Sequence, residues 1–292
     1  MPSNPKQNKH LKAGVIGDPI SHSLSPVLHN FWLKKYNING SYEAIHVTHK
    51  ELPTFLANLA EQGFEGINIT LPHKIDAMKH THSNGELSQS IGAINTIIKD
   101  ENEQFVGRNT DCIGFTSNLK QYAPTWSATN SDALILGAGG AARAVIVGLL
   151  DQGCRHITIA NRTKEKTESL ALDMNSVQNR AKIEIIDWEE RSDILRNHNL
   201  LVNTTQLGMT GQPSLDIDLS KLPDDAIVND IVYTPLKTEL LKAAEARGLT
   251  AIDGLGMLLW QAKYGFEAWF GKEVEVDDSL RNHVIAAMGQ EL

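Results

Sequence analysis

The pattern of apolar and polar positions divides the first part of the chain into short strands and helices. Apolar runs predict strands at 13–16, 42–47, 66–69, 93–98 and 104–107. Apolar residues three and four positions apart predict helices at 26–36, 50–62 and 74–80, and the polar run 99–103 predicts a hairpin turn. This order of elements is typical of an α/β domain.

After residue 110 the alternation becomes more regular. A helix is predicted at 111–124, followed by a polar linker at 125–131. Strands are predicted at 133–136, 156–160, 183–186, 200–203, 226–231 and 250–252, and a long apolar helix at 255–270. Strands separated by helices favour a parallel, doubly wound sheet. We predict a first α/β domain at 1–110, a Rossmann-type domain at 111–254, and C-terminal helices at 255–292 that pack back on the first domain.

The turn after the strand at 133–136 is the most informative segment. Gly137-Ala138-Gly139-Gly140-Ala141-Ala142 leads directly into a helix. In a dinucleotide-binding turn, Gly137 permits the tight bend, Gly139 lets the backbone approach a pyrophosphate, and Ala142 lets the helix pack closely on the strand. The helix N-terminus then attracts the phosphates. The alternative is a glycine-rich turn in an ordinary α/β unit, which the combination of strand, turn, helix and second strand disfavours.

The end of the next strand indicates which dinucleotide binds. NAD enzymes usually place Asp or Glu there to bind the ribose hydroxyls, whereas this chain has Asn161-Arg162-Thr163, with Lys166 one helical turn further on. The Arg162 guanidinium is a planar cationic group suited to a 2′-phosphate. We therefore predict NADP as the cofactor, with a solvated arginine as the alternative.

Polar residues at strand ends of the first domain supply candidate chemistry. The segment 68–74 is predicted to end a buried strand and enter a helix beside Lys74, while Asn95 and Asp111 follow at later strand and domain boundaries. Hydride transfer to a ketone needs a proton donor, and a lysine with a carboxylate partner can fill that role. We predict that Lys74 and Asp111 form this acid/base pair in an interdomain cleft. Taken singly, Lys74 is better explained as a solvated lysine and Asp111 as a helix cap, and only their combination with the other motifs favours the acid/base pair.

Several segments together resemble the shikimate dehydrogenase family, over nearly the whole chain. They are Ser23-Leu24-Ser25-Pro26, residues 68–74, residues 92–96, Asn109-Thr110-Asp111, Asn161-Arg162-Thr163 and Asp253-Gly254-Leu255-Gly256-Met257. The resemblance implies an oxidoreductase that reversibly reduces 3-dehydroshikimate to shikimate with NADPH, in the route to chorismate and the aromatic amino acids. It also implies an N-terminal substrate domain and an NADP domain.

The resemblance assigns roles to individual residues. Ser23 and Ser25 would hold the substrate carboxylate, with Tyr233 nearby, and Lys74 would be the acid/base. The residues implied to bind the substrate hydroxyls are Thr70, Asn95, Asp111 and Gln261. The residues implied to bind the cofactor are Gly137, Ala138, Gly139, Gly140, Ala141, Asn161, Arg162, Thr163, Lys166, Ile231, Gly254 and Met257, with Glu86 nearby. Ser25 followed by Pro26 also fits an ordinary helix N-cap.

Composition narrows the class of partner. The 292 residues carry a net charge of −8 and no run of lysines or arginines, which disfavours nucleic acid.

The two cysteines have no disulfide or metal spacing and are expected to be buried free thiols. His73, His80 and His82 lack a compact ligand set, so we expect surface roles and no metal. Residues 1–10 lack a signal core and no apolar run reaches membrane-spanning length, so we expect a cytoplasmic protein, monomeric or homodimeric.

Other functions remain open from the sequence. A quinate/shikimate dehydrogenase paralogue with broader substrate or cofactor use is the nearest, and Asn161-Arg162-Thr163 argues against its NAD-preferring form. A reductase of another small carbonyl compound would retain the glycine turn but lose the serine pair and Lys74. An NADP-binding regulatory module without turnover is the remaining alternative, because a fold alone never establishes catalysis.

Overall fold

A computed structural model describes residues 9–177 and 181–289. Residues 1–10 were predicted to lack a signal core. Of these, residues 1–8 lie outside the described residues. The chain divides into two compact units, Met1–Thr110 with Gln261–Leu292, and Asp111–Trp260. This division falls within the last long helix, at Gln261 instead of the predicted Leu255.

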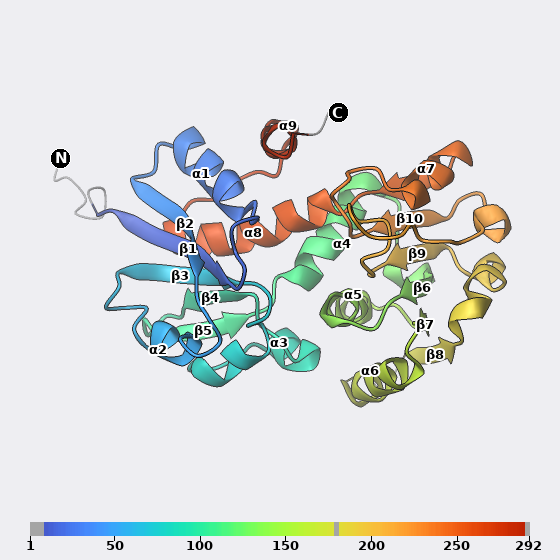
Figure 1. The fold of residues 1–292 in the computed structure, drawn as a ribbon, viewed down its shortest axis with the longest axis horizontal. Helices are drawn as coiled ribbons and strands as arrows, with labels where there is room; N and C mark the ends of the chain where they lie inside the picture. The colour runs from blue at the N-terminus through green and yellow to red at the C-terminus, as the bar shows by residue number, and fades with distance from the viewer. Residues whose placement is uncertain (1–8, 178–180, 290–292) are drawn as a thin grey trace. The chain divides into compact units, whose positions relative to one another are not determined.

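The first unit is built on a five-stranded sheet in the order β2-β1-β3-β4-β5 (Figure 1). Its strands are β1 (Leu11–Gly17), β2 (Gly40–His46), β3 (Phe64–Ile69), β4 (Thr96–Lys99) and β5 (Phe105–Arg108). β1 pairs in parallel with β2 and β3, whereas β4 is antiparallel to both β3 and β5. The sheet therefore begins as a parallel α/β layer and ends in the predicted hairpin.

The helices of the first unit differ from the periodicity in three places, one of them α3, where no helix was predicted. They are α1 (Ser25–Lys35), α2 (Leu52–Ala57), the 3-10 helix η2 (Asp76–His80), α3 (Glu86–Ile91), the last part of α8 (Leu255–Phe270) and α9 (Asp278–Ala287). The helix predicted at 50–62 is shorter, because turns lead from Asn58 into β3 through Gly63, whose φ is +76°. The helix predicted at 74–80 is wrong as an α-helix, since only a 3-10 helix forms, after Lys74.

The two faces of this sheet differ in character. On one face, α2 packs over apolar residues of β1 and β3 such as Ile16, Ile67 and Ile69. On the other face, the Trp269 indole of α8 lies against Gly66 and donates to the Ile97 carbonyl at 2.9 Å. A side chain at position 66 would collide with that indole, which explains a glycine inside a central strand.

The second unit is a six-stranded parallel sheet in the order β11-β10-β9-β6-β7-β8, which confirms the predicted doubly wound sheet. Its strands are β6 (Asp132–Leu136), β7 (His156–Ala160), β8 (Lys182–Ile186), β9 (Leu200–Asn203), β10 (Ile227–Asp230) and β11 (Thr250–Ile252). Its helices are α4 (Asp111–Tyr122), α5 (Gly140–Asp151), α6 (Lys164–Val177) and α7 (Glu239–Ala246), besides the start of α8.

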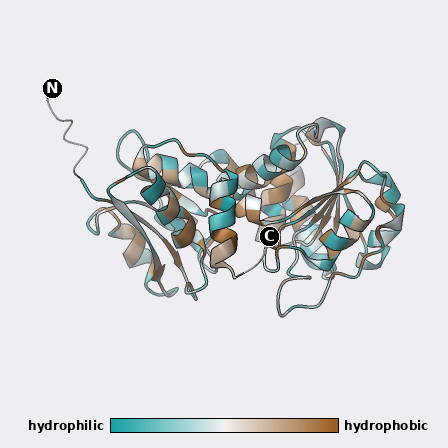
Figure 2. Ribbon diagram, turned by 90° about the horizontal axis from the view of Figure 1, so that it is seen from above, coloured by the Kyte–Doolittle hydropathy of each residue, from teal (hydrophilic) through white to brown (hydrophobic). Residues whose placement is uncertain are grey.

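Some connections of the second unit are 3-10 turns instead of α-helices. η4 (Trp188–Ser192) and η5 (Leu195–Asn197) join β8 to β9, and η6 (Leu219–Lys221) lies between β9 and β10. The linker predicted at 125–131 contains η3 (Ala128–Asn130). The strands remain strongly apolar in Figure 2, as expected where both faces of a parallel sheet are covered.

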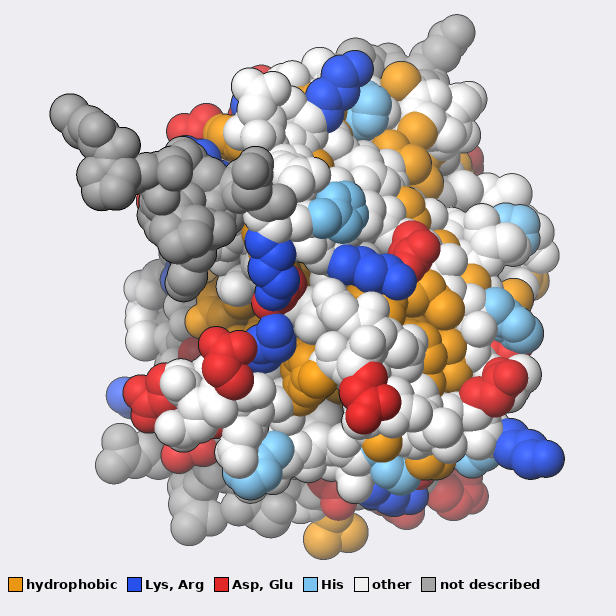
Figure 3. Space-filling model, turned by 90° about the vertical axis from the view of Figure 1, so that its left-hand side faces the viewer, with side chains coloured by type: hydrophobic (Ala, Val, Ile, Leu, Met, Phe, Trp, Pro, Cys, Tyr) orange, Lys and Arg blue, Asp and Glu red, His pale blue; other side chains and the backbone are white. Residues whose placement is uncertain are grey.

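The surface has mixed charge. On the face seen in Figure 3, basic and acidic side chains are interspersed. Among the ion pairs of the first unit, Lys12 Nζ lies 2.8 Å from Glu43 Oε1. Within the described residues, no helix is long and apolar enough to cross a membrane. Cys112 and Cys154 are buried free thiols, as predicted.

Candidate active site

The predicted carboxylate-binding serines lie at the start of α1. Ser25 is the first residue of the helix and is buried, while Leu24 occupies the N-cap position without a side-chain capping bond. The backbone N–H of Ser25 donates to the Ser23 hydroxyl at 3.3 Å. The side chain of Ser25 is therefore not the ordinary N-cap that Ser-Pro suggests.

Thr70 and Lys74 lie in the turn that follows β3. The Thr70 N–H donates to the Ile16 carbonyl at 3.0 Å, and the Thr70 methyl group lies where a side chain of Gly17 would begin, at 2.6 Å. The carbonyl of Lys74 accepts from the Ile94 N–H at 2.9 Å, which ties this turn to the segment before Asn95. Lys74 is half-buried.

His73, between these residues, corrects an expectation. The surface role predicted for it is wrong, because His73 is fully buried and its Nε2 lies 2.6 Å from the Val47 carbonyl. The apolar run before it does not reveal this, since the chain turns His73 inward and leaves Leu71 and Ile75 exposed by 70% and 68%.

Asn95 and Gln261, two predicted substrate-binding amides, are brought together from distant parts of the chain. Asn95 Nδ2 donates to Gln261 Oε1 at 3.3 Å and to Thr110 Oγ1 at 3.1 Å. Asn95 Oδ1 accepts from the Thr110 N–H at 2.8 Å. Both amides are buried. Buried amides that are held by several hydrogen bonds have defined orientations.

A second set of buried polar side chains continues this cluster. Asn68 Nδ2 donates to the Asn95 carbonyl at 3.1 Å and to Thr96 Oγ1 at 3.0 Å, and Thr96 Oγ1 donates to Asn95 Oδ1 at 3.0 Å. Tyr42 donates its hydroxyl proton to Asn68 Oδ1 at 2.6 Å. Sequence analysis assigned no role to Tyr42 or Thr96. The available signal was Asn68, a polar residue inside an apolar strand.

Asp111 is the first residue of α4 and is half-buried. It belongs to the second unit, whereas Lys74 belongs to the first. Their action as a pair stays a prediction.

The glycine turn has the local features of an anion site. Gly137 adopts φ +112°, and a side chain there would begin 2.6 Å from Thr204 Oγ1. Gly139 is the N-cap of α5, with no side-chain capping bond and no acidic residue in the first turn of the helix. A side chain at Gly139 or Gly140 would meet nothing within 4 Å. The space beside Gly139 and Gly140 is open, and neither a capping side chain nor a carboxylate in the first turn competes for the first N–H groups of α5, which favours a phosphate.

The segment after β7 carries the predicted cofactor-selecting residues. Asn161 Nδ2 donates to the Thr163 carbonyl at 2.9 Å, which shapes the turn into α6. Arg162 and Lys166 are exposed, and no ion pair joins either side chain to another described residue. The side chains of Arg162 and Lys166 therefore face solvent.

The remaining predicted residues fall into different places. Gly254 approaches the backbone of Ile231 so closely that no side chain would fit, and its N–H donates to the Val232 carbonyl at 3.2 Å. Met257 follows in the first turns of α8. Tyr233 is half-buried, and burial raises its pKa. Glu86 is exposed at the start of α3 in the first unit.

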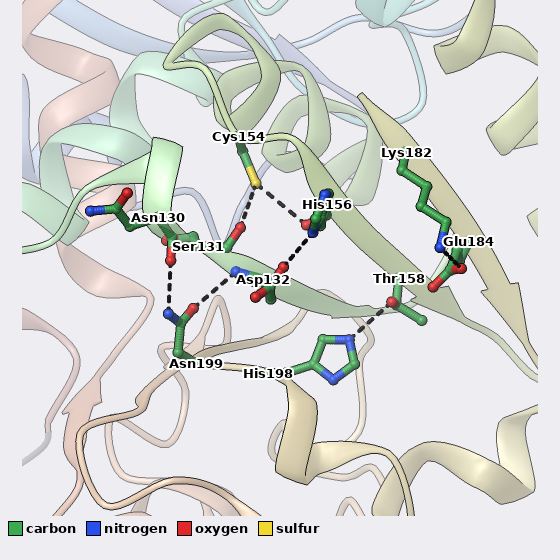
Figure 4. Close-up of polar contacts among 10 residues, drawn as sticks. All are labelled: Asn130, Ser131, Asp132, Cys154, His156, Thr158, Lys182, Glu184, His198 and Asn199. Carbon is green, nitrogen blue, oxygen red and sulfur yellow. Dashed lines mark hydrogen bonds and ion pairs between the residues drawn. The ribbon is translucent and has the colours of Figure 1, made fainter. Parts of the chain in front are cut away.

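A pocket of about 320 Å³ in the second unit contains none of the predicted site residues (Figure 4). Its polar groups already satisfy one another: His156 Nδ1 lies 2.8 Å from Asp132, Lys182 Nζ lies 2.5 Å from Glu184, and His198 contacts Thr158. A pocket whose polar groups are paired internally leaves few free groups to recognise a ligand.

The sequence of the chain matches the sequences of known protein families. Family models for the shikimate dehydrogenase substrate binding domain, for shikimate/quinate 5-dehydrogenase and for the shikimate 5′-dehydrogenase C-terminal domain match residues 15–97, 119–208 and 254–278. A shikimate dehydrogenase (NADP(+)) of Paramagnetospirillum magneticum is 48% identical over 274 residues, 94% of this chain and 98% of that protein. The chain belongs to the shikimate dehydrogenase family. The resemblance stated from the sequence is confirmed.

Solved structures of the shikimate dehydrogenase family share the fold. Shikimate 5-dehydrogenase of Thermus thermophilus, in complex with NADP(H) and shikimate, matches with a TM-score of 0.82 and 33% identity, over 95% of this chain and 99% of that chain. Quinate dehydrogenase of Corynebacterium glutamicum, in complex with NAD, matches with a TM-score of 0.88 and 29% identity, over 96% and 100%. The predicted fold class is confirmed.

Proposed function

We propose that this protein catalyses the reversible NADPH-dependent reduction of 3-dehydroshikimate to shikimate, a step toward chorismate and the aromatic amino acids. The family relationship supports the reaction class. The observation that supports the assignment of the site is the hydrogen bond between Asn95 and Gln261. Both amides are assigned to the substrate hydroxyls, and the bond brings them together although they lie 166 positions apart in the sequence.

On this proposal the first unit, with the helices after residue 255, is the substrate domain. Ser23 and Ser25 hold the substrate carboxylate, with Tyr233 beside them, and the Ser23 hydroxyl donates to it. Thr70, Asn95, Asp111 and Gln261 bind the ring hydroxyls. Buried amides that bind a substrate hydroxyl reject analogues that lack it, because the hydrogen bond to that hydroxyl would be lost without replacement.

Lys74 carries the proton. During reduction, its ammonium group donates a proton to the oxygen of the carbonyl as that oxygen becomes an alkoxide, and Asp111 holds the lysine and the reacting hydroxyl in line. In the reverse direction the neutral amine accepts the proton of the substrate hydroxyl. Leu71 and Ile75, the exposed apolar neighbours of Lys74, favour a site from which water is excluded once substrate is bound.

The residues at 137–141 and 161–166 fit NADP. The open N-terminus of α5 suits the pyrophosphate, and the exposed cations Arg162 and Lys166 suit a 2′-phosphate. Asn161 and Thr163 shape that turn, and Ile231, Gly254 and Met257 would border the nicotinamide end, with Glu86 nearby. When bound, NADPH supplies the hydride.

We further propose a small-molecule substrate as the only ligand besides NADP, with no nucleic-acid partner, in a cytoplasmic monomer or homodimer. The net charge of −8 and the interspersed surface charges support the absence of a nucleic-acid partner. Sedimentation with and without shikimate and NADP would establish the state of assembly.

The direct test follows NADPH absorbance after purified protein is mixed with NADP and shikimate. Quinate in place of shikimate, and NAD in place of NADP, run as parallel arms. We expect a signal selective for shikimate and NADP. Activity mainly with quinate or NAD would favour the quinate dehydrogenase alternative, while binding of NADP without turnover of either acid would refute the proposal and favour a regulatory module.

A further inference from the structure

Tyr42 occupies a buried position between the predicted carboxylate site and the predicted hydroxyl site. It lies in β2 with only 3% of its surface exposed. Its hydroxyl donates to Asn68 Oδ1 at 2.6 Å. Burial raises the pKa of Tyr42 well above its usual range, and a hydrogen bond with the Ser25 side chain acts in the opposite direction. The phenol is therefore neutral and contacts polar groups on two sides.

The proton of Tyr42 sets the polarity of the hydrogen bonds beyond it. A phenol has a single proton to donate, and here it goes to Asn68 Oδ1. That bond turns Asn68 Nδ2 toward Thr96 Oγ1, and Thr96 passes its own proton to Asn95 Oδ1. Asn95 Nδ2 is then left to face Gln261 Oε1. Reversal of any amide in this chain would place like groups against each other.

The ring of Tyr42 is fixed as firmly as its hydroxyl. The His29 ring stacks on it with the ring centroids 3.9 Å apart and the planes at 6°. His29 is fully buried and is itself in contact with Trp32, Phe266 and Trp269. Burial lowers the pKa of His29 to about 3, so the imidazole is neutral at physiological pH. An aromatic stack of this kind leaves the phenol little freedom to rotate.

We propose that Tyr42 is a positioning residue that holds Ser25, at the predicted carboxylate site, and the amides for the ring hydroxyls at one fixed separation. The inference rests on the proposed function. The ligand class is a cyclic carboxylate whose hydroxyls lie at a set distance from the acid group. Tyr42 does not touch this ligand; it acts through Ser25 at one end and through Asn68, Thr96 and Asn95 at the other.

Tyr42→Phe tests this role because it removes the hydroxyl and keeps the ring on His29. We expect KM for shikimate to rise about tenfold, the equivalent of one to two lost hydrogen bonds, while KM for NADP stays unchanged. Tyr264→Phe, at an exposed position of α8, is the matched control. An unchanged KM for shikimate in Tyr42→Phe would overturn the inference, as would an equal rise in KM for NADP, which a general loss of structure produces.

A double-mutant cycle tests whether Tyr42 acts through Ser25. If it does, Tyr42→Phe raises KM by a smaller factor when Ser25→Ala is already present than in the unmodified protein, whereas fully additive effects would contradict the inference. If Tyr42→Phe does not fold, Thr96→Val breaks the same chain at its middle with a side chain of nearly equal shape, and the same selective rise in KM is expected. Failure of the proposed function is distinguishable, because then the unmodified protein would not oxidise shikimate.

Discussion

The burial of His29 makes a quantitative prediction about acid stability. The pKa of His29 falls from 6.5 to about 3 in the folded protein because of burial, although the Asn68 side chain acts to raise it. A histidine with a depressed pKa stays neutral in the folded state while the unfolded chain takes up a proton. Its contribution to the free energy of unfolding is therefore present above pH 6.5 and is lost as the pH falls toward 3.

The magnitude follows from the two pKa values. At pH 7.5 the effect is close to zero, at pH 5 it amounts to about 2 kcal/mol, and at pH 3 it amounts to about 4 kcal/mol. His29→Phe retains an aromatic ring in the cluster with Tyr42 and Trp269 but cannot titrate. Whatever the variant loses through altered packing, that loss is common to both pH values.

The assay is urea unfolding of both proteins at pH 7.5 and pH 5, followed by the fluorescence of the five tryptophans. We expect the stability difference between the two proteins to move in favour of His29→Phe by about 2 kcal/mol at the lower pH. A difference that is the same at both pH values would mean that the imidazole titrates normally. The reasoning from its burial would then be wrong.

The remaining predictions concern the proposed chemistry and the second unit. Lys74→Ala should lower kcat by about 10²- to 10⁴-fold with KM for shikimate nearly unchanged; a raised KM with normal kcat would make Lys74 a binding residue. Arg162→Asp should raise KM for NADP about tenfold more than KM for NAD, and equal losses would contradict the 2′-phosphate role. Gly137→Ala should lower Tm because of its φ of +112°, whereas Gly139→Ala should keep Tm and lose NADP affinity, in thermal melts with and without NADP. Burial raises the pKa of Asp230 to about 6, so its contribution to stability falls as the pH rises from 3.8 to 6. Relative to the unmodified protein, Asp230→Asn should gain about 2 kcal/mol in unfolding free energy between pH 4 and pH 7, and parallel curves would refute this.

A central strand of the parallel sheet such as β9 was predictable because burial on both faces leaves an apolar run, whereas the edge strand β11 is only partly buried. The predicted bounds 156–160, 200–203 and 250–252 coincide with β7, β9 and β11. The short elements were harder. α3 spans six residues and shows less than two full turns of periodicity, so no helix was predicted there. The end of α2 depends on the turn at Gly63, which periodicity does not register.

For the site, motifs identified residue types but not their contacts. Nothing near Asn95 indicates that its amide meets Gln261, because that contact depends on the return of α8 to the first unit. The hydrogen bonds of Tyr42 could not be predicted for a different reason. A tyrosine in a strand shows the same sequence pattern whether or not its hydroxyl takes part in a chain of hydrogen bonds. The signal lay in a different strand, β3, where Asn68 is an isolated amide among apolar neighbours.

The two halves of the proposed site differ in how readily their specificity can change. Substrate recognition would depend on Asn95, Gln261 and the chain that begins at Tyr42, all of them buried and bonded to one another. A substitution there leaves a buried partner unsatisfied, at a cost of about 1–3 kcal/mol. Cofactor choice would depend on Arg162 and Lys166, which are exposed and whose replacement disturbs no buried contact. Substitutions that alter the choice between NADP and NAD should therefore leave the stability of the protein unchanged. Substitutions that alter which carboxylic acid the protein accepts as substrate should also lower its stability.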